Sequence, residues 1–335
     1  MDAEKLAAIG RLIASSPSNV AVRLAEMEGI SRQAASARLA ALKDAGVIAV
    51  AGRGRGVKYS LVQSVHEVRT YAIGGLSEDT VWREQCAPAV RDLPENVRGI
   101  WHHGITEMIN NAIDHSGSPD VRIGISRNAL STHAWVSDQG EGIFLKIQRA
   151  LDLYDAREAI LELAKGKLTT DPAHHSGEGI FFSSKMFDQF SIRSGSLLFQ
   201  HDGDYPDILF ERTGSDAGTT VIMALENDSK RTTKEVFDCF AQPEDFSFAK
   251  TIVPVRLAQH EGEKLVSRSQ AKRLTRRFER FQTVVLDFSG VEEIGQAFAD
   301  EVFRVFQAAH PEITMTPIHT SHAVNAMISR AKAHG

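Results

Sequence analysis

Apolar and polar positions in the first 62 residues follow a pattern that predicts helices and then a hairpin. A helical period covers three segments, residues 3–14, 19–29 and 31–46. Residues suited to cap or end the second and third helices stand at their limits: Ser18 or Asn19, Gly29, Ser31 and Gly46. Residues 47–62 then alternate apolar and polar side chains around a Gly-rich turn, which predicts a two-stranded hairpin.

The last third of the chain alternates strand-like and helix-like segments. Strands are predicted at residues 251–258, 283–289 and 313–320. Helices are predicted at residues 267–281, 295–310 and 321–334. Strands that alternate with helices in this way predict a small α/β domain.

A chain of 335 residues is too long for one ordinary domain and suggests two or three. The patterns divide it into a first domain, a connector with one helix, a central domain and a C-terminal domain, at residues 1–62, 63–98, 99–226 and 250–335. The expected fold class is therefore α/β multidomain.

Composition agrees with a soluble globular protein: 42% of residues are hydrophobic, 24% are charged, and the formal net charge is -5. Residues 1–15 lack the order of a signal peptide, and no run of about 18 apolar residues occurs. Cys86 and Cys239 have no metal-ligand spacing, which favours reduced thiols. We therefore expect a cytoplasmic protein that does not span a membrane.

Basic residues gather in the first domain although the whole chain is acidic. Residues 31–60 hold six Lys or Arg and one Asp, a local net charge of +5. The order of elements resembles a winged helix-turn-helix domain, with residues 31–42 as recognition helix and 52–56 as wing tip. The resemblance implies contacts to duplex DNA from Arg32, Gln33, Ser36, Arg38, Arg53, Arg55 and Lys58. The alternative is a winged helix used only for protein contacts, because fold alone does not determine function.

Residues 102–116, "HHGITEMINNAIDHS", predict an amphipathic helix with an unusually polar side. One arc of the helical wheel holds Glu107, Asn110, Asn111, Asp114 and His115. The opposite arc holds Ile105, Met108, Ile109, Ala112 and Ile113. Amphipathicity alone requires only solvent on the polar side, so the motifs that follow along the chain decide the interpretation.

Three glycine motifs follow this helix in order. They are Asp138-x-Gly140-x-Gly142 after a strand, Gly177-x-Gly179 at a helix start, and Gly218-Thr219-Thr220 before a strand. Each is weak alone, because alternate glycines are common in turns. The ordered set, with the Asn-rich helix, resembles the nucleotide-binding boxes of the GHKL ATPases. That family implies an α/β sandwich that binds ATP and Mg²⁺.

The resemblance implies a role for each matching residue. Asn111 is the implied Mg²⁺ ligand, Glu107 the residue that orients or deprotonates the attacking nucleophile, and Asp138 the acceptor for the adenine amino group. The implied nucleotide contacts are Asp114, His115, Gly140, Gly142, Ile143, Gly177, Glu178, Gly179, Ile180 and Thr220, or Thr219 in place of Thr220. Residues 144–176 resemble the lid over ATP, with Lys165 and Lys167 able to reach phosphates.

Within the GHKL family the Glu-x-x-x-Asn-x-x-x-His spacing of Glu107, Asn111 and His115 is most similar to anti-sigma-factor kinases. The C-terminal domain resembles the STAS-like domains of unknown function found behind such ATPases, over residues 286–306. STAS partners of these kinases carry a serine where this chain reads Gly295, Gln296, Ala297 and Phe298, and Ser289 lies on the strand side. We therefore expect this domain to serve docking or dimerisation.

The leading interpretation is an ATP-responsive DNA-binding transcription regulator that forms a homodimer and hydrolyses ATP slowly with Mg²⁺. Its STAS-like domain would bind a protein partner. One alternative is a serine/threonine protein kinase of the anti-sigma type. Another is a defence or stress ATPase that uses the winged helix for assembly.

Overall fold

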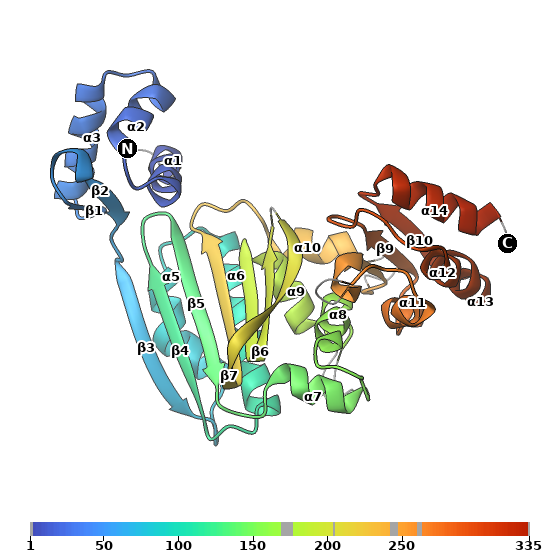
Figure 1. Ribbon diagram of the computed structural model, residues 1–335. Coiled ribbons are helices and arrows are strands. Elements are labelled where there is room, and N and C mark those ends of the chain that lie inside the picture. Colours follow the sequence, from blue (N-terminus) through green and yellow to red (C-terminus); the bar gives the residue numbers. More distant parts are fainter. Residues whose placement is uncertain (1–2, 169–176, 204, 242–246, 260–262, 334–335) are drawn as a thin grey trace.

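The computed structural model describes residues 3–168, 177–203, 205–241, 247–259 and 263–333. Three units follow one another along the chain (Figure 1). Their elements are mixed α/β, as the sequence patterns predict. Among the described residues, no helix has both the length and the apolar surface needed to cross a membrane.

The N-terminal unit has its own small core. Helices α1 (Ala3–Ser15), α2 (Val20–Glu28) and α3 (Arg32–Asp44) precede the antiparallel hairpin of β1 (Ile48–Ala51) and β2 (Lys58–Leu61). The Ser31 hydroxyl accepts the Ala34 amide at 3.1 Å and so caps α3 as predicted, and Gly29 ends α2 with φ 65°. Asn19 holds the N-cap position of α2, but its side chain makes no capping bond.

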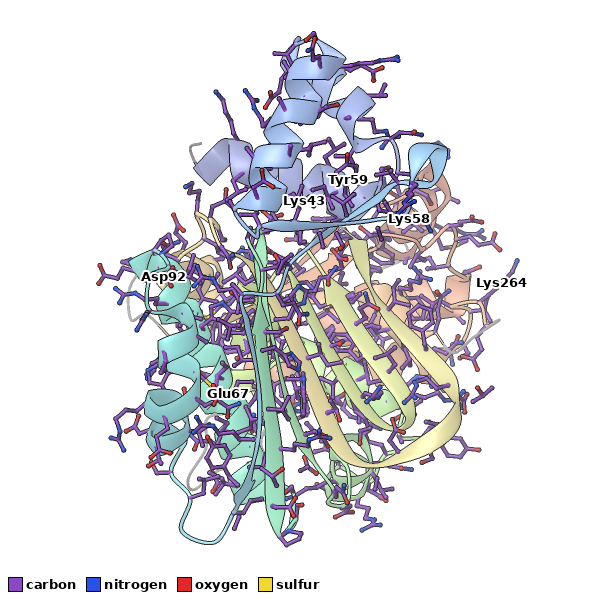
Figure 2. The ribbon with its side chains drawn as sticks, turned by 90° about the vertical axis from the view of Figure 1, so that its left-hand side faces the viewer. Lys43, Lys58, Tyr59, Glu67, Asp92 and Lys264 are labelled. Carbon is purple, nitrogen blue, oxygen red and sulfur yellow. The ribbon has the colours of Figure 1, made fainter. Side chains whose placement is uncertain are left out.

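The middle unit is built on a five-stranded antiparallel sheet of order β3-β4-β5-β7-β6. Its strands are β3 (Val65–Ala72), β4 (Asp120–Arg127), β5 (Ser131–Asp138), β6 (Gln189–Asp202) and β7 (Tyr205–Glu226). Helices of this unit pack on one face of the sheet, and Figure 2 looks onto the strands from the other side, with Glu67 marked on β3. The sheet and these helices form a two-layer arrangement.

Residues 63–98, expected to be a connector and one helix, instead begin this sheet. The strand β3 pairs with β4 from Val65 opposite Arg127 to Ala72 opposite Asp120, so it is an edge strand. The predicted helix is present as α4 (Glu78–Val81), a π-helical turn (Trp82–Cys86) and α5 (Ala87–Val90). The buried Gln85 amide donates to the Ile123 carbonyl at 3.0 Å, which ties this helix to β4.

Further helices of the middle unit follow α5 along the chain. They are α6 (Glu95–His115), α7 (Ile143–Ala150), α8 (Glu158–Lys165), α9 (Gly179–Met186) and α10 (Thr233–Phe240). The long helix α6 buries eight residues, among them Trp101, Ile105 and Ile109, against the unit's core. This packing fixes which of its sides faces α7 and α9.

The C-terminal unit is a three-stranded parallel sheet with helices. Its strands are β8 (Lys250–Pro254), β9 (Thr283–Asp287) and β10 (Thr314–Ile318), in the order β10-β9-β8. Its helices are α11 (Arg268–Thr275), α12 (Gln296–Asp300), a π-helical turn (Glu301–Phe306), α13 (Gln307–Ala309) and α14 (His322–Ala333), with 3-10 turns at Val255–Ala258 and Phe278–Arg280.

The helix predicted over residues 267–281 ends early, at Thr275. Arg277 adopts a left-handed conformation with φ 65°, which interrupts the helix before the short turn Phe278–Arg280. The middle and C-terminal units also share one hydrophobic core. In that core the Phe248 ring lies 4.7 Å from Phe181 and 5.5 Å from Phe281.

Candidate functional site

A cavity of about 300 Å³ lies where α6, α7 and α9 meet the sheet. Five separate segments of the chain supply its walls. Its lining is Glu107, Met108, Asn111, Ala112, His115, Ser116, Val136, Asp138, Gly142, Ile143, Lys146, Ile147, Leu163, Leu168, Gly177, Gly179, Ile180, Thr219 and Val221. The cavity therefore brings together the Asn-rich helix and all three glycine motifs, which the sequence places far apart.

The helix α6 presents Glu107, Asn111 and His115 to the cavity. These residues are spaced four apart, so they lie on one side of the helix, one turn above another. Asn111 lines the cavity and Asn110 is absent from its lining. The buried Nδ2 of Asn111 has no hydrogen-bond partner. An amide can be turned to exchange its nitrogen and oxygen, so Asn111 offers the cavity one unsatisfied polar atom.

Glu107 faces the start of α9. A Cβ added to Gly179 would lie 1.9 Å from Oε2 of Glu107, so only glycine allows this approach. Gly177 has φ 73° and lies against the backbone of Leu168, whose amide donates to the Gly177 carbonyl at 3.0 Å. The close contacts at Gly177 and Gly179 therefore determine the position of this cavity wall. Glu178, the N-cap residue of α9, does not line the cavity.

Asp138, the last residue of β5, lines the cavity. Its Oδ1 accepts the amides of Gly140 at 2.9 Å and Thr219 at 3.2 Å. Burial raises the pKa of this carboxyl above its usual value, and the two amide bonds offset part of that shift. Gly140 does not line the cavity. Only glycine fits at this position, because a Cβ there would lie 1.8 Å from the Ser116 carbonyl oxygen.

Thr219, rather than the predicted Thr220, faces the cavity. The Oγ1 of Thr219 accepts the Ile143 amide at 2.9 Å, at the start of α7. Thr220 points to the opposite face of the sheet, where its hydroxyl pairs with that of Ser137 at 2.8 Å. Side chains alternate along a strand, so the register of β7 permits only one of the two threonines to line the cavity.

The two lysines expected to reach phosphates point elsewhere. Lys167 Nζ donates to the Arg280 carbonyl at 3.0 Å, and Lys165 is fully buried against the C-terminal unit. Lys146 is the only lysine or arginine among the described residues that line the cavity. None of the motifs predicted from the sequence includes it. The available signal was its position one turn after Gly142, on the cavity side of the helix that this glycine begins.

Of the other predicted residues, some line the cavity and some do not. Ile143 and Ile180 line the cavity with His115, whereas Asp114 is exposed and absent from the lining. Asp114 is the residue before His115 on α6, and a step of one residue turns the side chain by about 100°. Part of the predicted lid, residues 169–176, lies outside the described residues.

The residues predicted to contact DNA lie on α3 and around the hairpin. Arg32, Gln33 and Ser36 are exposed on the first turns of α3, and Arg53 and Lys58 are exposed at the hairpin. Arg38 differs, because it is half-buried and forms an ion pair with Glu28 of α2. It therefore joins α2 to α3. The side chain of Arg55 lies outside the described residues. Figure 2 marks Lys43 and Lys58 in this unit.

Comparison with known proteins identifies one part of the chain. Residues 270–325 match the family model described as "STAS-like domain of unknown function (DUF4325)". The match runs from α11 into α14, so the C-terminal unit is a STAS-like domain. No curated protein and no solved structure matches the chain.

Proposed function

We propose that the chain is an ATP-responsive regulator whose middle unit is a GHKL-type domain that binds Mg·ATP in the cavity. The observation that carries this proposal is the convergence of Glu107, Asn111 and Asp138 on one cavity. Their segments are the ones that resemble the GHKL nucleotide-binding boxes. A cavity of this size, apolar in part and with a few placed polar groups, suits a small ligand.

Asp138 supports recognition of the adenine end. The two amide donors bind its Oδ1, and we assign its Oδ2 to the amino group of adenine. Val136, Ile143 and Val221 provide the apolar surface that a flat base would contact. A carboxylate that is held by backbone amides and buried beside apolar residues selects a ligand with a donor at that place.

Asn111 suits a magnesium ion held mainly by phosphates and water. Mg²⁺ prefers oxygen ligands and keeps several of its waters, so one amide oxygen is a sufficient protein contribution. The unsatisfied amide of Asn111 fits this role, and no other contact of the described residues occupies its Nδ2. The ion would neutralise phosphate charge when bound. Lys146, which donates to the His115 carbonyl at 2.8 Å, adds positive charge to the same cavity.

Glu107 is the candidate general base, one turn before Asn111 on α6. It would orient a water molecule and accept its proton as the water attacks the terminal phosphate. Gly179 places the start of α9 directly against this carboxylate. This arrangement supports slow hydrolysis of ATP, which would end the ATP-bound state of the regulator.

Three helices followed by a hairpin, the order of elements in a winged helix-turn-helix domain, support the second half of the proposal, DNA binding in a homodimer. The unit touches the middle sheet through α1, where Arg11 Nε donates to Glu226 at 2.8 Å and its guanidinium lies 3.5 Å from Asp228. Glu226 ends β7, the strand that also carries Thr219. A change at the cavity could therefore reach the N-terminal unit along one strand.

Coupling between nucleotide and DNA tests this function. We expect the affinity for a mixed-sequence duplex, measured by fluorescence anisotropy at fixed salt, to change several-fold when Mg·ATP is added. Asp138→Asn should remove the nucleotide effect and leave DNA binding intact. DNA affinity that is identical with and without Mg·ATP would overturn the regulatory proposal.

A second candidate is a serine/threonine protein kinase of the anti-sigma type, and the STAS-like domain at residues 270–325 favours it. In this function a protein hydroxyl would replace water as the nucleophile. The helix start Gly295–Phe298 offers no hydroxyl, so the acceptor would be a residue of another protein or Ser289 on the strand side of the same domain. Incubation with ATP labelled in its γ-phosphate separates the two candidates: label on protein indicates the kinase, and label only in free phosphate indicates the ATPase.

A further inference from the structure

The helix α8 is buried along its whole length, although it carries three charged side chains. Glu162 is 1% exposed and Lys165 is 0% exposed. Buried charges are strongly unfavourable unless they are paired and hydrogen-bonded. The partners of these two residues therefore show what α8 is built to contact.

The STAS-like unit supplies most of those partners. Lys165 Nζ donates to Glu162 at 2.7 Å and to the carbonyls of Arg276 and Arg273 at 2.9 and 3.2 Å. Arg277 Nη1 donates to the other oxygen of Glu162 at 2.9 Å. The end of α11 thus provides both a cation and two carbonyl oxygens for the buried pair.

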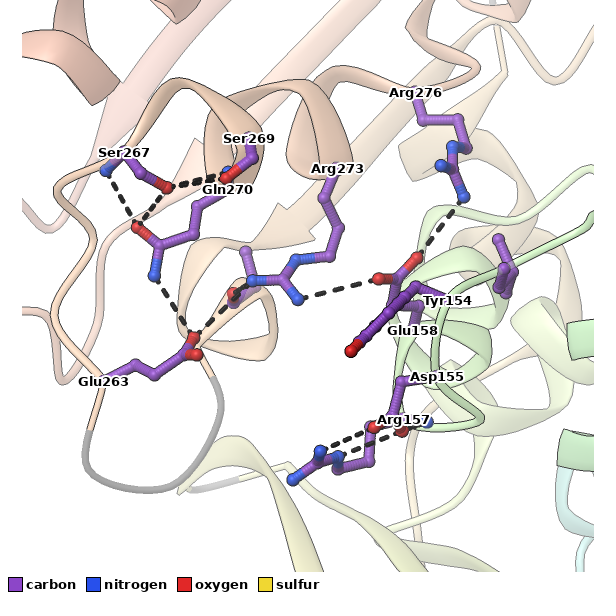
Figure 3. A network of polar contacts seen from close by, with 12 residues as sticks. Tyr154, Asp155, Arg157, Glu158, Glu263, Ser267, Ser269, Gln270, Arg273 and Arg276 are labelled. Atoms are coloured by element: carbon purple, nitrogen blue, oxygen red, sulfur yellow. Dashed lines mark hydrogen bonds and ion pairs between the residues drawn. The ribbon is translucent and has the colours of Figure 1, made fainter.

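Around this centre a second set of ion pairs joins the same two helices. The carboxylate of Glu158 lies 3.7 Å from Arg273 and 3.4 Å from Arg276 (Figure 3). Arg273 also lies 3.6 Å from Glu263, which accepts the side-chain amide of Gln270 at 3.2 Å. Figure 3 shows Arg273 between the carboxylates of Glu263 and Glu158, with Arg276 directed at Glu158.

Arg277 does more than pair with Glu162. Its Nη2 donates to the carbonyl of Gly166 at 3.3 Å and also to the carbonyl of Lys167. The Thr251 hydroxyl holds the Lys165 carbonyl at 2.7 Å, and Arg280 holds the Lys167 carbonyl at 3.1 Å. Three successive carbonyls, at residues 165–167, are therefore fixed by the STAS-like unit. The left-handed backbone of Arg277, with φ 65°, accompanies this placement.

The segment that Arg277 holds is also a wall of the cavity. Leu163 on α8 and Leu168, directly after Lys167, both line it. Leu168 is in turn bonded to Gly177, another lining residue. A displacement of the carbonyls at residues 166–167 would therefore move the cavity wall.

We propose that Arg277 positions the Leu163–Leu168 wall, so that docking of the STAS-like unit on α8 and occupation of the cavity stabilise each other. This proposal rests on the proposed function for the identity of the ligand, Mg·ATP, but the positioning itself does not depend on it. Because coupling between two sites is reciprocal, a ligand in the cavity must strengthen the contact of α8 with α11 as much as that contact strengthens ligand binding. A protein that binds the STAS-like unit could in this way change nucleotide affinity.

The test uses the full chain with Arg277→Met and Arg277→Lys, and with Lys264→Met as matched control. Lys264 forms an exposed ion pair with Glu293 in the same unit and does not contact residues 158–168. Hydrogen exchange is followed in peptides that cover residues 158–168 and 268–281, with and without Mg·ATP. The affinity for Mg·ATP is measured by calorimetry.

We expect Arg277→Met to weaken Mg·ATP binding by about tenfold and to speed exchange at residues 163–168. Mg·ATP should slow exchange at residues 268–281 of the wild type and of Lys264→Met, but not of Arg277→Met. Arg277→Lys should behave like Arg277→Met in milder form, because a lysine can pair with Glu162 but cannot also span two carbonyls. Should Arg277→Met not fold, the decision falls to Arg277→Lys, since Glu162 keeps its ion pair with Lys165 in that variant as well.

Two results would overturn the proposal. One is wild-type affinity for Mg·ATP in a folded Arg277 variant. The other is exchange at residues 163–168 that is no faster in that variant than in the wild type, with no ligand present. The second comparison stands even when the wild type fails to bind Mg·ATP, which would defeat the proposed function alone.

Discussion

Gly179 lies so close to Glu107 that a Cβ at position 179 would stand 1.9 Å from the Glu107 carboxylate oxygen. We therefore expect Gly179→Ala to displace Glu107 or the start of α9, and to reduce ATP turnover at least tenfold, as loss of a positioned general base does. The measurement is the steady-state rate of phosphate release.

Gly99→Ala provides the control for this change. Gly99 is exposed on the same helix as Glu107, and a Cβ there meets nothing within 4 Å. Alanine is the better helix former, so this variant should be more stable by about 0.5–1 kcal/mol with unchanged turnover. Normal turnover in Gly179→Ala would contradict the role given to the contact between positions 107 and 179.

Asp138→Asn should change which purine the cavity accepts. The backbone amides of Gly140 and Thr219 require an acceptor at Oδ1, so the new amide nitrogen must take the place of Oδ2 and face the ligand. A donor there opposes the amino group of adenine but suits the carbonyl of hypoxanthine. We expect ATP affinity to fall by about a hundredfold and the ratio of ITP to ATP affinity to rise. An unchanged ratio would show that Asp138 does not face the base.

Lys165 should make stability depend on pH in the alkaline range. Burial lowers its pKa from 10.5 to about 8 in the folded chain, and Glu162 opposes that shift. Between these values the unfolded chain holds a proton that the folded chain has released, so the free energy of unfolding rises with pH. Below pH 8 both states are protonated and the slope vanishes.

Urea unfolding of the wild type and of Lys165→Met, at several pH values from 7 to 10, measures this effect. Across this pH range the free energy of unfolding of the wild type should rise, relative to that of the variant, by up to about 3 kcal/mol. Lys264→Met, which alters an exposed lysine, should run nearly parallel to the wild type from pH 7 to 9. Parallel curves for Lys165→Met as well would mean that Lys165 is not buried as an ammonium group.

Arg32 and Arg38 should respond differently to substitution, although both were predicted to contact DNA. Arg32 is exposed, so Arg32→Ala should weaken duplex binding and lower the salt slope by about one without loss of stability. Arg38 pairs with Glu28, so Arg38→Ala should chiefly lower the melting temperature of the N-terminal unit. Salt titrations of DNA binding and thermal melts separate the two outcomes, and equal DNA defects without any loss of stability would contradict the pairing.

Local signals explain how much of the fold could be predicted. Ser31 and Gly29 mark helix limits through bonds to their immediate neighbours, and the structure confirms both positions. Part of the cavity lining was predicted as well, since the glycine motifs occur where backbone and side chains approach as closely as Gly179 and Glu107 do. Capping residues and required glycines are residue types that can be recognised in the sequence itself.

Interactions between distant segments explain the rest. Lys167 bonds a carbonyl 113 residues further along, so nothing near it in the sequence indicates that it turns away from the cavity. The choice between Thr219 and Thr220 depends on the register of β7, which its neighbouring strands determine. The strand β3 was missed because its partner β4 begins 48 residues after it ends.

Binding of Mg·ATP to the wild type and to two twin variants, Asn111→Ala and Asn110→Ala, tests the central claim most directly. Calorimetry should show saturable binding of one nucleotide per chain, Asn110→Ala should retain it, and Asn111→Ala should weaken it at least tenfold. Glu107→Ala should bind nucleotide and lack turnover. No binding by the wild type, or equal binding by both asparagine variants, would contradict the assignment of the cavity to Mg·ATP.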